Sequence, residues 1–197
     1  MLRSIEVGAV VAITASSLLY SLIWLRPHLW LAVTAALAPR GFPPTRAMAF
    51  AAHALKLLQL ALIAYHFFEA DPRGAAFLAT PLWRSLPGFL LVGAGQALNA
   101  SVYAALGEAG VYYGVKLGAK VPWVTGWPYS HVRDPQYVGA LLSLGGAYAL
   151  GVISGFVCVG WALNYFYLMA LEANLFGPAA AARARGRRRP DSQRKVA

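Results

Sequence analysis

The stretch VGALLSLGGAYALGVISGFVCVGWALNYFYLMAL, residues 138–171, decides the fold of this chain. As a single α-helix its 34 residues would be about 51 Å long, whereas the hydrocarbon core of a bilayer is about 30 Å thick. Two full spans of about 20 residues each would need a longer stretch. Gly151 and Gly155 lie near its middle, so we predict a helical hairpin with two short or tilted arms. This hairpin returns Glu172 to the side of the membrane on which Arg133 lies.

The composition indicates an integral membrane protein. Of the 197 residues, 59% are hydrophobic and 12% are charged, against about a quarter charged in an ordinary soluble domain. No acidic residue occurs between Glu6 and Glu69. A soluble monomer is therefore excluded, and we expect one membrane domain over residues 1–182.

The net charge of +10 is concentrated at the C-terminus. Residues 183–197 hold seven basic residues and one acidic residue. A nucleic-acid-binding arm is one interpretation. We favour the other, a disordered cytosolic tail beside anionic lipid that obeys the positive-inside rule. We therefore expect a multi-pass protein with a cytosolic C-terminus and no nucleic-acid partner. Cys158 is the single cysteine, so no disulfide framework is available.

Hydropathy predicts an all-α protein, a bundle of about four to five membrane helices of which the last two form the hairpin. The apolar run at Val7–Leu25 is too long for a signal peptide and no cleavage site follows it, so we expect a retained helix. The other expected segments are His28–Leu37, which is too short to span, Ala47–Phe68 and Gly88–Gly118.

Three glycines repeat at four-residue spacing in the last of these segments, at positions 110, 114 and 118. On one long helix they would form a smooth strip for close helix contact, through which an oligomer would form.

The expected membrane segment Ala47–Phe68 carries three ionisable residues, His53, Lys56 and His66. Ionisable groups there suggest function, but we favour the structural explanations, a snorkelling lysine and a histidine bonded to a neighbouring helix.

Residues 93–98, GAGQAL, imitate the start of a dinucleotide-binding fingerprint. Position 98 is a leucine and no strand precedes it, so the fingerprint fails. On the residues alone, close helix packing explains Gly93 and Gly95 better.

The motif RDPQY, residues 133–137, places charges at the start of the hairpin. Pro135 favours a helix start, and Asp134 then takes the N-cap position. Arg133 is placed to bind a carboxylate or phosphate in a bidentate manner. Glu172, at a helix C-terminus, opposes the helix dipole and suggests a cationic partner. Such a pair suits a ligand that carries both signs of charge.

The string ALGEAGVYYGVKLGAKVPWVTGWPYSHVRDPQYVG, residues 105–139, resembles the plant-type phospholipid N-methyltransferases. The similarity covers nearly the whole chain and is strongest over Leu90–Glu172. Animal phosphatidylethanolamine N-methyltransferases and isoprenylcysteine carboxyl methyltransferases share a looser form of this core. The resemblance implies an S-adenosyl-L-methionine-dependent enzyme of the endoplasmic reticulum membrane that converts phosphatidyl-N-methylethanolamine, through the dimethyl lipid, to phosphatidylcholine.

The resemblance also implies a set of cofactor-binding residues, and it reverses the packing interpretation of the glycines. The animal enzymes have two adjacent glutamates where this chain has Glu172 followed by Ala173, as the plant-type sequences do. If residues 107–135 are cytosolic, a straight helix from Gly88 puts Gly93 towards the opposite face. The implied cofactor-binding residues are Gly93, Ala94, Gly95, Arg133, Pro135, Tyr137, Gly139, Glu172 and Ala173.

Methyl transfer to an amine requires a free lone pair, so a group must accept the proton of the ammonium. The candidates are Asp134, Tyr137, Glu108 and water. Two alternatives remain open at this point. One keeps the chemistry but uses phosphatidylethanolamine itself or a prenylcysteine carboxylate as acceptor, and the other is a non-enzymatic membrane scaffold. The scattered histidines and unpaired carboxylates predict no metal site.

Overall fold

The structure is a computed structural model that describes residues 4–65, 67–68, 77 and 80–173. His66, the end of the predicted domain and the predicted tail over residues 183–197 lie outside the described residues. The described part of the chain is helical and contains no strand, which confirms the all-α prediction. Its elements are α1 (Ser4–Leu25), α2 (Pro27–Leu37), α3 (Pro44–Tyr65), α5 (Leu82–Val111), the 3-10 helix η2 (Gly114–Leu117), α6 (Pro135–Ala149) and α7 (Gly155–Glu172).

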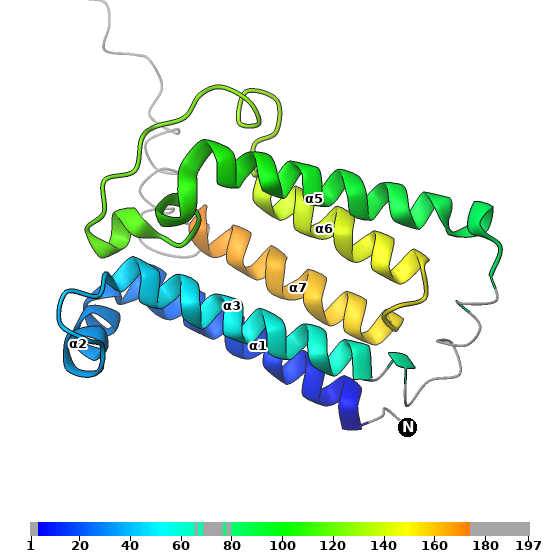
Figure 1. Cartoon of the computed structure of the whole chain (residues 1–197), viewed down its shortest axis with the longest axis horizontal. Coiled ribbons are helices and arrows are strands. Elements are labelled where there is room, and N and C mark those ends of the chain that lie inside the picture. Colours follow the sequence, from blue (N-terminus) through cyan, green and yellow to red (C-terminus); the bar gives the residue numbers. More distant parts are fainter. Residues whose placement is uncertain (1–3, 66, 69–76, 78–79, 174–197) are drawn as a thin grey trace, which may run out of the picture.

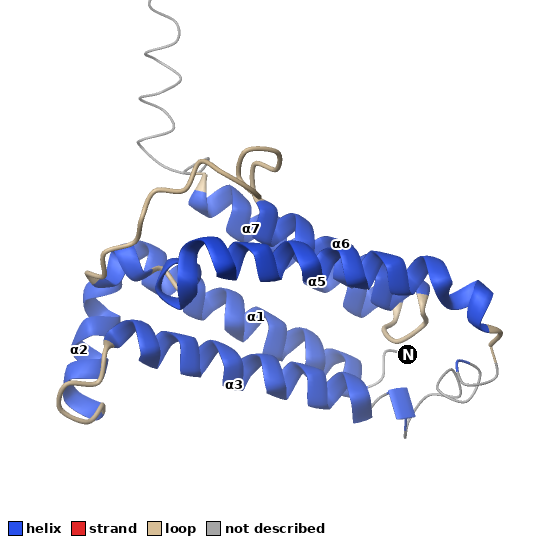
Figure 2. Ribbon diagram, turned by 45° about the horizontal axis from the view of Figure 1, so that its top comes forward, coloured by secondary structure: helices blue, strands red, loops and turns tan. Residues whose placement is uncertain are grey.

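The long helices run side by side as one bundle, and α2 lies across one end of it (Figures 1 and 2). Within the described residues, four segments are long and apolar enough to cross a membrane: α1, α3, α5 together with η2, and α7. The short α2, with 11 residues, follows α1 directly because the Arg26–Pro27 step interrupts the first helix. Its place at the end of the bundle fits an interfacial helix.

The predicted hairpin is confirmed. Helix α6 has 15 residues and α7 has 18, and the two are joined by a turn in which Gly151 has a φ of 72°. Ser154 caps α7, because its hydroxyl accepts a hydrogen bond of 3.3 Å from the backbone N–H of Val157. The start of α6 and the end of α7 therefore lie at the same end of the bundle as α2 (Figure 1).

The start of α6 differs in one detail from the prediction. Pro135 is the first helical residue and Asp134 occupies the N-cap position, both as predicted. The carboxylate of Asp134 makes no capping hydrogen bond, however. Its side chain lies beside Arg133 instead, with 3.8 Å between Arg133 Nε and Asp134 Oδ2.

Helix α5 differs from the predicted Gly88–Gly118 segment at both ends. It begins at Leu82 and ends at Val111, and it carries a non-helical residue, Gly107, with a φ of 67°. Tyr113 and Gly118 also have positive φ, so no continuous helix connects them. The strip predicted from the glycines at 110, 114 and 118 is therefore wrong, which removes the reason for expecting an oligomer through it.

Close helix contact occurs instead between α5 and α6, which lie side by side in both views (Figures 1 and 2). A Cβ atom added at Gly146 would lie 2.6 Å from the backbone oxygen of Gly88. A Cβ atom added at Gly139 would lie 2.7 Å from the backbone oxygen of Gly95. Both distances are shorter than a carbon and an oxygen tolerate, so these glycines let the two backbones touch.

This packing predicts opposite outcomes for two adjacent glycines of α6. Gly146→Ala forces the backbones apart, and we expect a loss of about 1–3 kcal/mol of stability. Gly145→Ala is the matched control, because a Cβ atom there meets nothing within 4 Å. Thermal unfolding of both variants in the same detergent measures the difference. Equal melting temperatures for the two variants would contradict the described helix contact.

Candidate functional site

The bundle encloses a cavity of about 490 Å³, lined by side chains from α1, α3, α5, α6 and α7. This volume is within the range of small-molecule sites. Its lining changes character along the bundle. Tyr20, His53 and Tyr137 lie towards the end where α2 is found, whereas Ile63 and Ile153 lie towards the hairpin turn. The cavity is thus suited to a ligand with a polar end and an apolar end.

A carboxylate bonded by two tyrosines lies next to the polar end of the cavity. Oε1 of Glu172, the last residue of α7, accepts hydrogen bonds from the hydroxyls of Tyr113 and Tyr137. Tyr137 comes from the first turn of α6 and lines the cavity. We call Glu172, Tyr113 and Tyr137 the carboxylate clasp. In the described residues the partners that the structure gives this anion are neutral hydroxyls, and the cationic ligand inferred from the helix dipole stays a prediction.

Tyr113 reaches Glu172 because the chain turns sharply after α5. Its backbone is left-handed, with a φ of 56°, and its ring packs against Tyr20 and Trp24 of α1 at centroid distances of 5.5 and 5.4 Å. The clasp thus holds α7, the first turn of α6 and the segment after α5 together, and the rings of α1 support it. Tyr113 could not be identified as a site residue from the sequence, since adjacent tyrosines give no signal for a left-handed turn.

Five of the predicted cofactor-binding residues lie with Gly95 at the start of α6 and the end of α7. Pro135 and Gly139 are buried on the same helix as Tyr137, and Gly95 packs against Gly139. Gly95 therefore lies near the start of α6, which resolves the expected difficulty about the depth of the glycines. Ala173 follows Glu172 directly, and its backbone N–H donates to Met169 O at 2.9 Å.

Of the predicted cofactor-binding residues in the described part of the chain, only Tyr137 lines the cavity itself. Gly93 and Ala94 are exposed, and a Cβ atom added at Gly93 would meet nothing within 4 Å. The side chain of Arg133 is 88% exposed and does not line the cavity. The pKa of Tyr129 is raised by burial and, secondly, by the negative charge of Asp134. The Asp134 carboxylate therefore lies near Tyr129, among the loop residues before α6. Glu108 is exposed beside the Gly107 kink and is likewise absent from the cavity lining.

Two buried oxygen atoms in the cavity lining have no hydrogen-bond partner. They are Oδ1 of Asn99, on α5, and Oε1 of Gln59, on α3. The Gln59 amide nitrogen is fully used, since it donates to Ala12 O at 3.1 Å and to Ser16 Oγ at 2.6 Å. Unpaired buried acceptors are unusual, because each forfeits the hydrogen bonds it would make in water. Both atoms are suited to a ligand that brings N–H donors.

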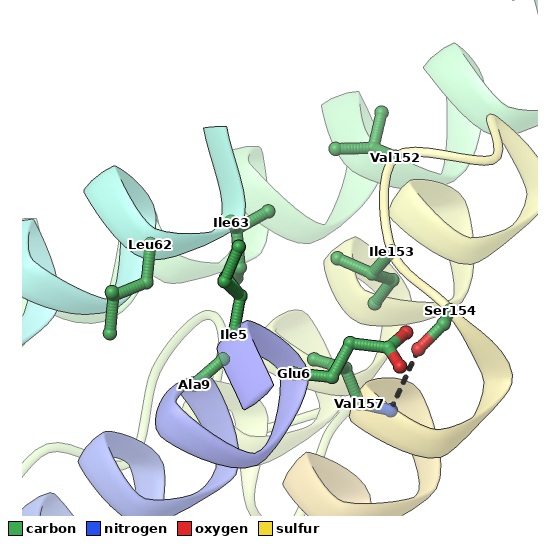
Figure 3. A pocket seen from close by; sticks show the side chains of 9 residues that line it. All are labelled: Ile5, Glu6, Ala9, Leu62, Ile63, Val152, Ile153, Ser154 and Val157. Atoms are coloured by element: carbon green, nitrogen blue, oxygen red, sulfur yellow. Dashed lines mark hydrogen bonds between the residues drawn. The ribbon is translucent and has the colours of Figure 1, made fainter. Parts of the chain in front are cut away.

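A second, much smaller cavity lies at the opposite end, where α1 meets the hairpin turn (Figure 3). Glu6 and Ser154 lie near one another there among apolar side chains that include Ile63 and Val157. Its volume of about 10 Å³ is at most the space of one water molecule. The large cavity is therefore the candidate ligand site.

The comparisons with known proteins identify the class to which this fold and site belong. The family model described as phospholipid methyltransferase matches residues 83–176, a region that contains all of α5 except its first residue, α6, α7 and the whole clasp. An Arabidopsis thaliana protein named phosphatidyl-N-methylethanolamine N-methyltransferase is 36% identical over 154 residues, which cover 78% of this chain and 84% of that relative. No solved structure matches the chain.

This chain therefore belongs to the phospholipid methyltransferase family, and it is a methyltransferase enzyme built from membrane helices. The resemblance noted over residues 105–139 is confirmed. The alternative of a non-enzymatic scaffold is set aside by the same findings.

Proposed function

We propose that this protein transfers methyl groups from S-adenosyl-L-methionine to the amine of phosphatidyl-N-methylethanolamine, forming the dimethyl lipid and then phosphatidylcholine. The named activity of the Arabidopsis relative and the family match support this proposal. The structural observation that carries it is the cavity of about 490 Å³, which has the clasp beside its polar end and apolar side chains at its other end.

The side chains at the polar end fit the proposed cofactor. It bears an amino group and an adenine amine, which match the unpaired acceptor on Asn99. It also carries positive charge, which the carboxylate of Glu172 complements. Tyr137, Asn99 and Glu172 are the residues that would hold it, with the backbone of Gly139 and Gly95 beside them. When bound, the cofactor supplies a methyl group on a positively charged sulfur.

The protein's own contribution is position and environment. Helices α1, α3, α5, α6 and α7 surround the cavity and hold both reactants in one orientation, which removes much of the entropic barrier to the reaction. Low-dielectric walls disfavour a charged ammonium and so help the amine to lose its proton. The apolar end, with Ile13, Leu144 and Ile153, accommodates the acyl chains of a lipid acceptor.

We also propose that the clasp end of the bundle faces the cytosol. Basic residues gather at this end, around α2, at the start of α3, within η2 and in the loop between η2 and α6. Cytosolic loops of membrane proteins carry such an excess of lysine and arginine. The proposed membrane is that of the endoplasmic reticulum, where the resemblance places the family. The basic residues at this end are Arg26, Arg40, Arg46, Lys116, Lys120 and Arg133.

An acceptor assay tests the proposed reaction. Purified protein in lipid nanodiscs is given methyl-labelled S-adenosyl-L-methionine and one acceptor at a time: phosphatidylethanolamine, its monomethyl or dimethyl derivative, or a prenylcysteine. We expect label in the monomethyl and dimethyl lipids and little in the other two. Preferred labelling of phosphatidylethanolamine or of the prenylcysteine would contradict the proposed acceptor, and no labelling at all would contradict the proposed reaction.

Arg133 provides a second test, because its exposed guanidinium stands beside the start of α6 with only the distant Asp134 carboxylate as an ion-pair partner in the described residues. We propose that it binds the cofactor carboxylate. Arg133→Ala should then lower kcat/KM by about 10- to 100-fold, as expected for loss of a charged hydrogen bond. Lys120→Ala, an exposed cation of the same loop, is the matched control. Activity near wild type for Arg133→Ala would discard this assignment.

A further inference from the structure

Two ionisable residues of α3 face the cavity and have no role in the function proposed so far. His53 and Lys56 both line it, and both belong to a helix with the length and composition of a membrane span. Residues three apart lie on one face of an α-helix, with about 5–6 Å between their Cβ atoms. An imidazole and an ammonium group are therefore presented side by side to the ligand space. Such groups inside a membrane usually serve a function.

The hydrogen bonds of His53 define which ring nitrogen carries the proton. Nδ1 lies 2.7 Å from the carbonyl oxygen of Ala49, which only accepts, so Nδ1 is the donor. In the neutral ring Nε2 then holds a lone pair. The hydroxyl of Tyr112 lies 3.3 Å from Nε2 and donates to it. The hydroxyl of Tyr103 lies 2.5 Å from that of Tyr112 and donates to it in turn.

These bonds form a relay that runs from Tyr103 through Tyr112 to His53, and all three side chains line the cavity. The oxygen of Tyr103 keeps its lone pairs for a donor that arrives from the cavity. The relay ends at Nε2, a ring nitrogen that holds a lone pair and can accept a proton. This geometry fits a proton acceptor for an N–H group of a ligand in the cavity.

Lys56 presents a positive charge without a matching anion. Its Nζ lies 4.5 Å from the centre of the Trp161 ring, and in the described residues no carboxylate forms an ion pair with it. A charge in the membrane interior is unfavourable unless it is paired. The cavity that Lys56 lines is therefore suited to an anionic group.

We propose that His53 and Lys56 form the binding site for the headgroup of the acceptor lipid, which deepens the proposed function and rests on it. The headgroup joins an amine to a phosphodiester through two carbon atoms, so its two charged ends match two side chains one helical turn apart. Lys56 binds the phosphodiester. The relay takes the proton of the amine.

The direction of the site agrees with a lipid in the leaflet nearest the clasp. His53 lies closer than Lys56 to the start of α3, which is at the clasp end. Beyond Lys56, the same helix contributes Leu60 and Ile63 to the cavity. The amine thus points towards the clasp, the phosphodiester lies one turn deeper, and the acyl chains continue along the apolar part.

The proton acceptors expected from the sequence do not compete with this relay. Asp134 and Glu108 are exposed and lie outside the cavity lining. Tyr137 donates its hydroxyl proton to Glu172. The titratable groups that share the cavity with His53 are Lys56 on its own helix, Tyr20 from α1, Tyr103 and Tyr112 from α5 and the segment after it, Tyr137 from α6 and Tyr165 from α7.

The proton step balances along the relay. An N–H bond of the lipid ammonium breaks and its proton passes to the oxygen of Tyr103. Tyr103 passes its own proton to Tyr112, and Tyr112 passes its own to Nε2 of His53. The products are a neutral amine with a lone pair, two unchanged tyrosines and an imidazolium. A neutral amine with a free lone pair is the form that a methyl donor bound beside it would alkylate.

The phosphodiester contact is tested with Lys56→Gln. Removal of a charge from the membrane interior should not impair folding. We expect the KM for the monomethyl lipid to rise at least tenfold, while calorimetry finds an unchanged affinity for S-adenosylhomocysteine. Lys120→Gln, outside the cavity, is the control and should change neither value. An unchanged lipid KM in Lys56→Gln would overturn this part of the proposal.

The proton relay is tested with His53→Gln and Tyr112→Phe, and with His131→Gln as an exposed control. We expect kcat to fall by about 100-fold or more in the first two variants, as is typical when a general base is lost. His53→Gln should also change the pH dependence of kcat, because the relay then lacks its final proton acceptor. Nitrogen NMR of labelled histidine adds a readout that is independent of turnover. It should show protonated Nδ1 at neutral pH and a shifted Nε2 signal in Tyr112→Phe.

The outcomes separate the headgroup site from the proposed function. A wild type that methylates the monomethyl lipid, together with variants that keep wild-type kcat and pH profile, would overturn the relay alone. A protonated Nε2 with a bare Nδ1 would overturn it as well. A wild type that methylates none of the amine lipids would overturn the proposed function, and the headgroup site with it.

Discussion

The position of one carboxylate governs this structure. Glu172 stands at the C-terminus of α7, where the helix dipole is unfavourable for an anion, and two tyrosine hydroxyls stabilise it there. For both hydroxyls to reach it, α6 and α7 must form a hairpin and the chain after α5 must turn back at Tyr113. The clasp thereby brings segments far apart in the sequence to one end of the cavity.

Direct contact between the backbones of α5 and α6 sets the other wall. The glycine pairs Gly88–Gly146 and Gly95–Gly139 leave no room for side chains between these helices. Tyr137 and Asn99 therefore reach the cavity from helices in a fixed relation, while α3 faces them with His53 and Lys56. The site combines one rigid wall, which fits cofactor binding, with a second wall whose charges fit a lipid headgroup.

Much of the fold could be predicted from the sequence, because hydrocarbon thickness constrains helix length. The hairpin followed from the 34 residues of the 138–171 stretch, and the helix start followed from Pro135. The kink at Gly107 and the left-handed Tyr113 could not be predicted, since glycine and tyrosine also occur inside regular helices. The contacts of Tyr113 with Glu172 and of Tyr112 with His53 join residues 59 positions apart. Such contacts depend on packing, which no local pattern in a single sequence records.

The most direct measurement is a double-mutant cycle on the clasp, read out as the affinity for S-adenosylhomocysteine. Tyr137→Phe and Glu172→Gln are measured singly and together by calorimetry in the same nanodiscs. If the two residues act as one unit beside the cofactor, the double variant should bind about as weakly as the weaker single variant. Losses that multiply, as for independent sites, would contradict the account, and so would single variants that bind like the wild type.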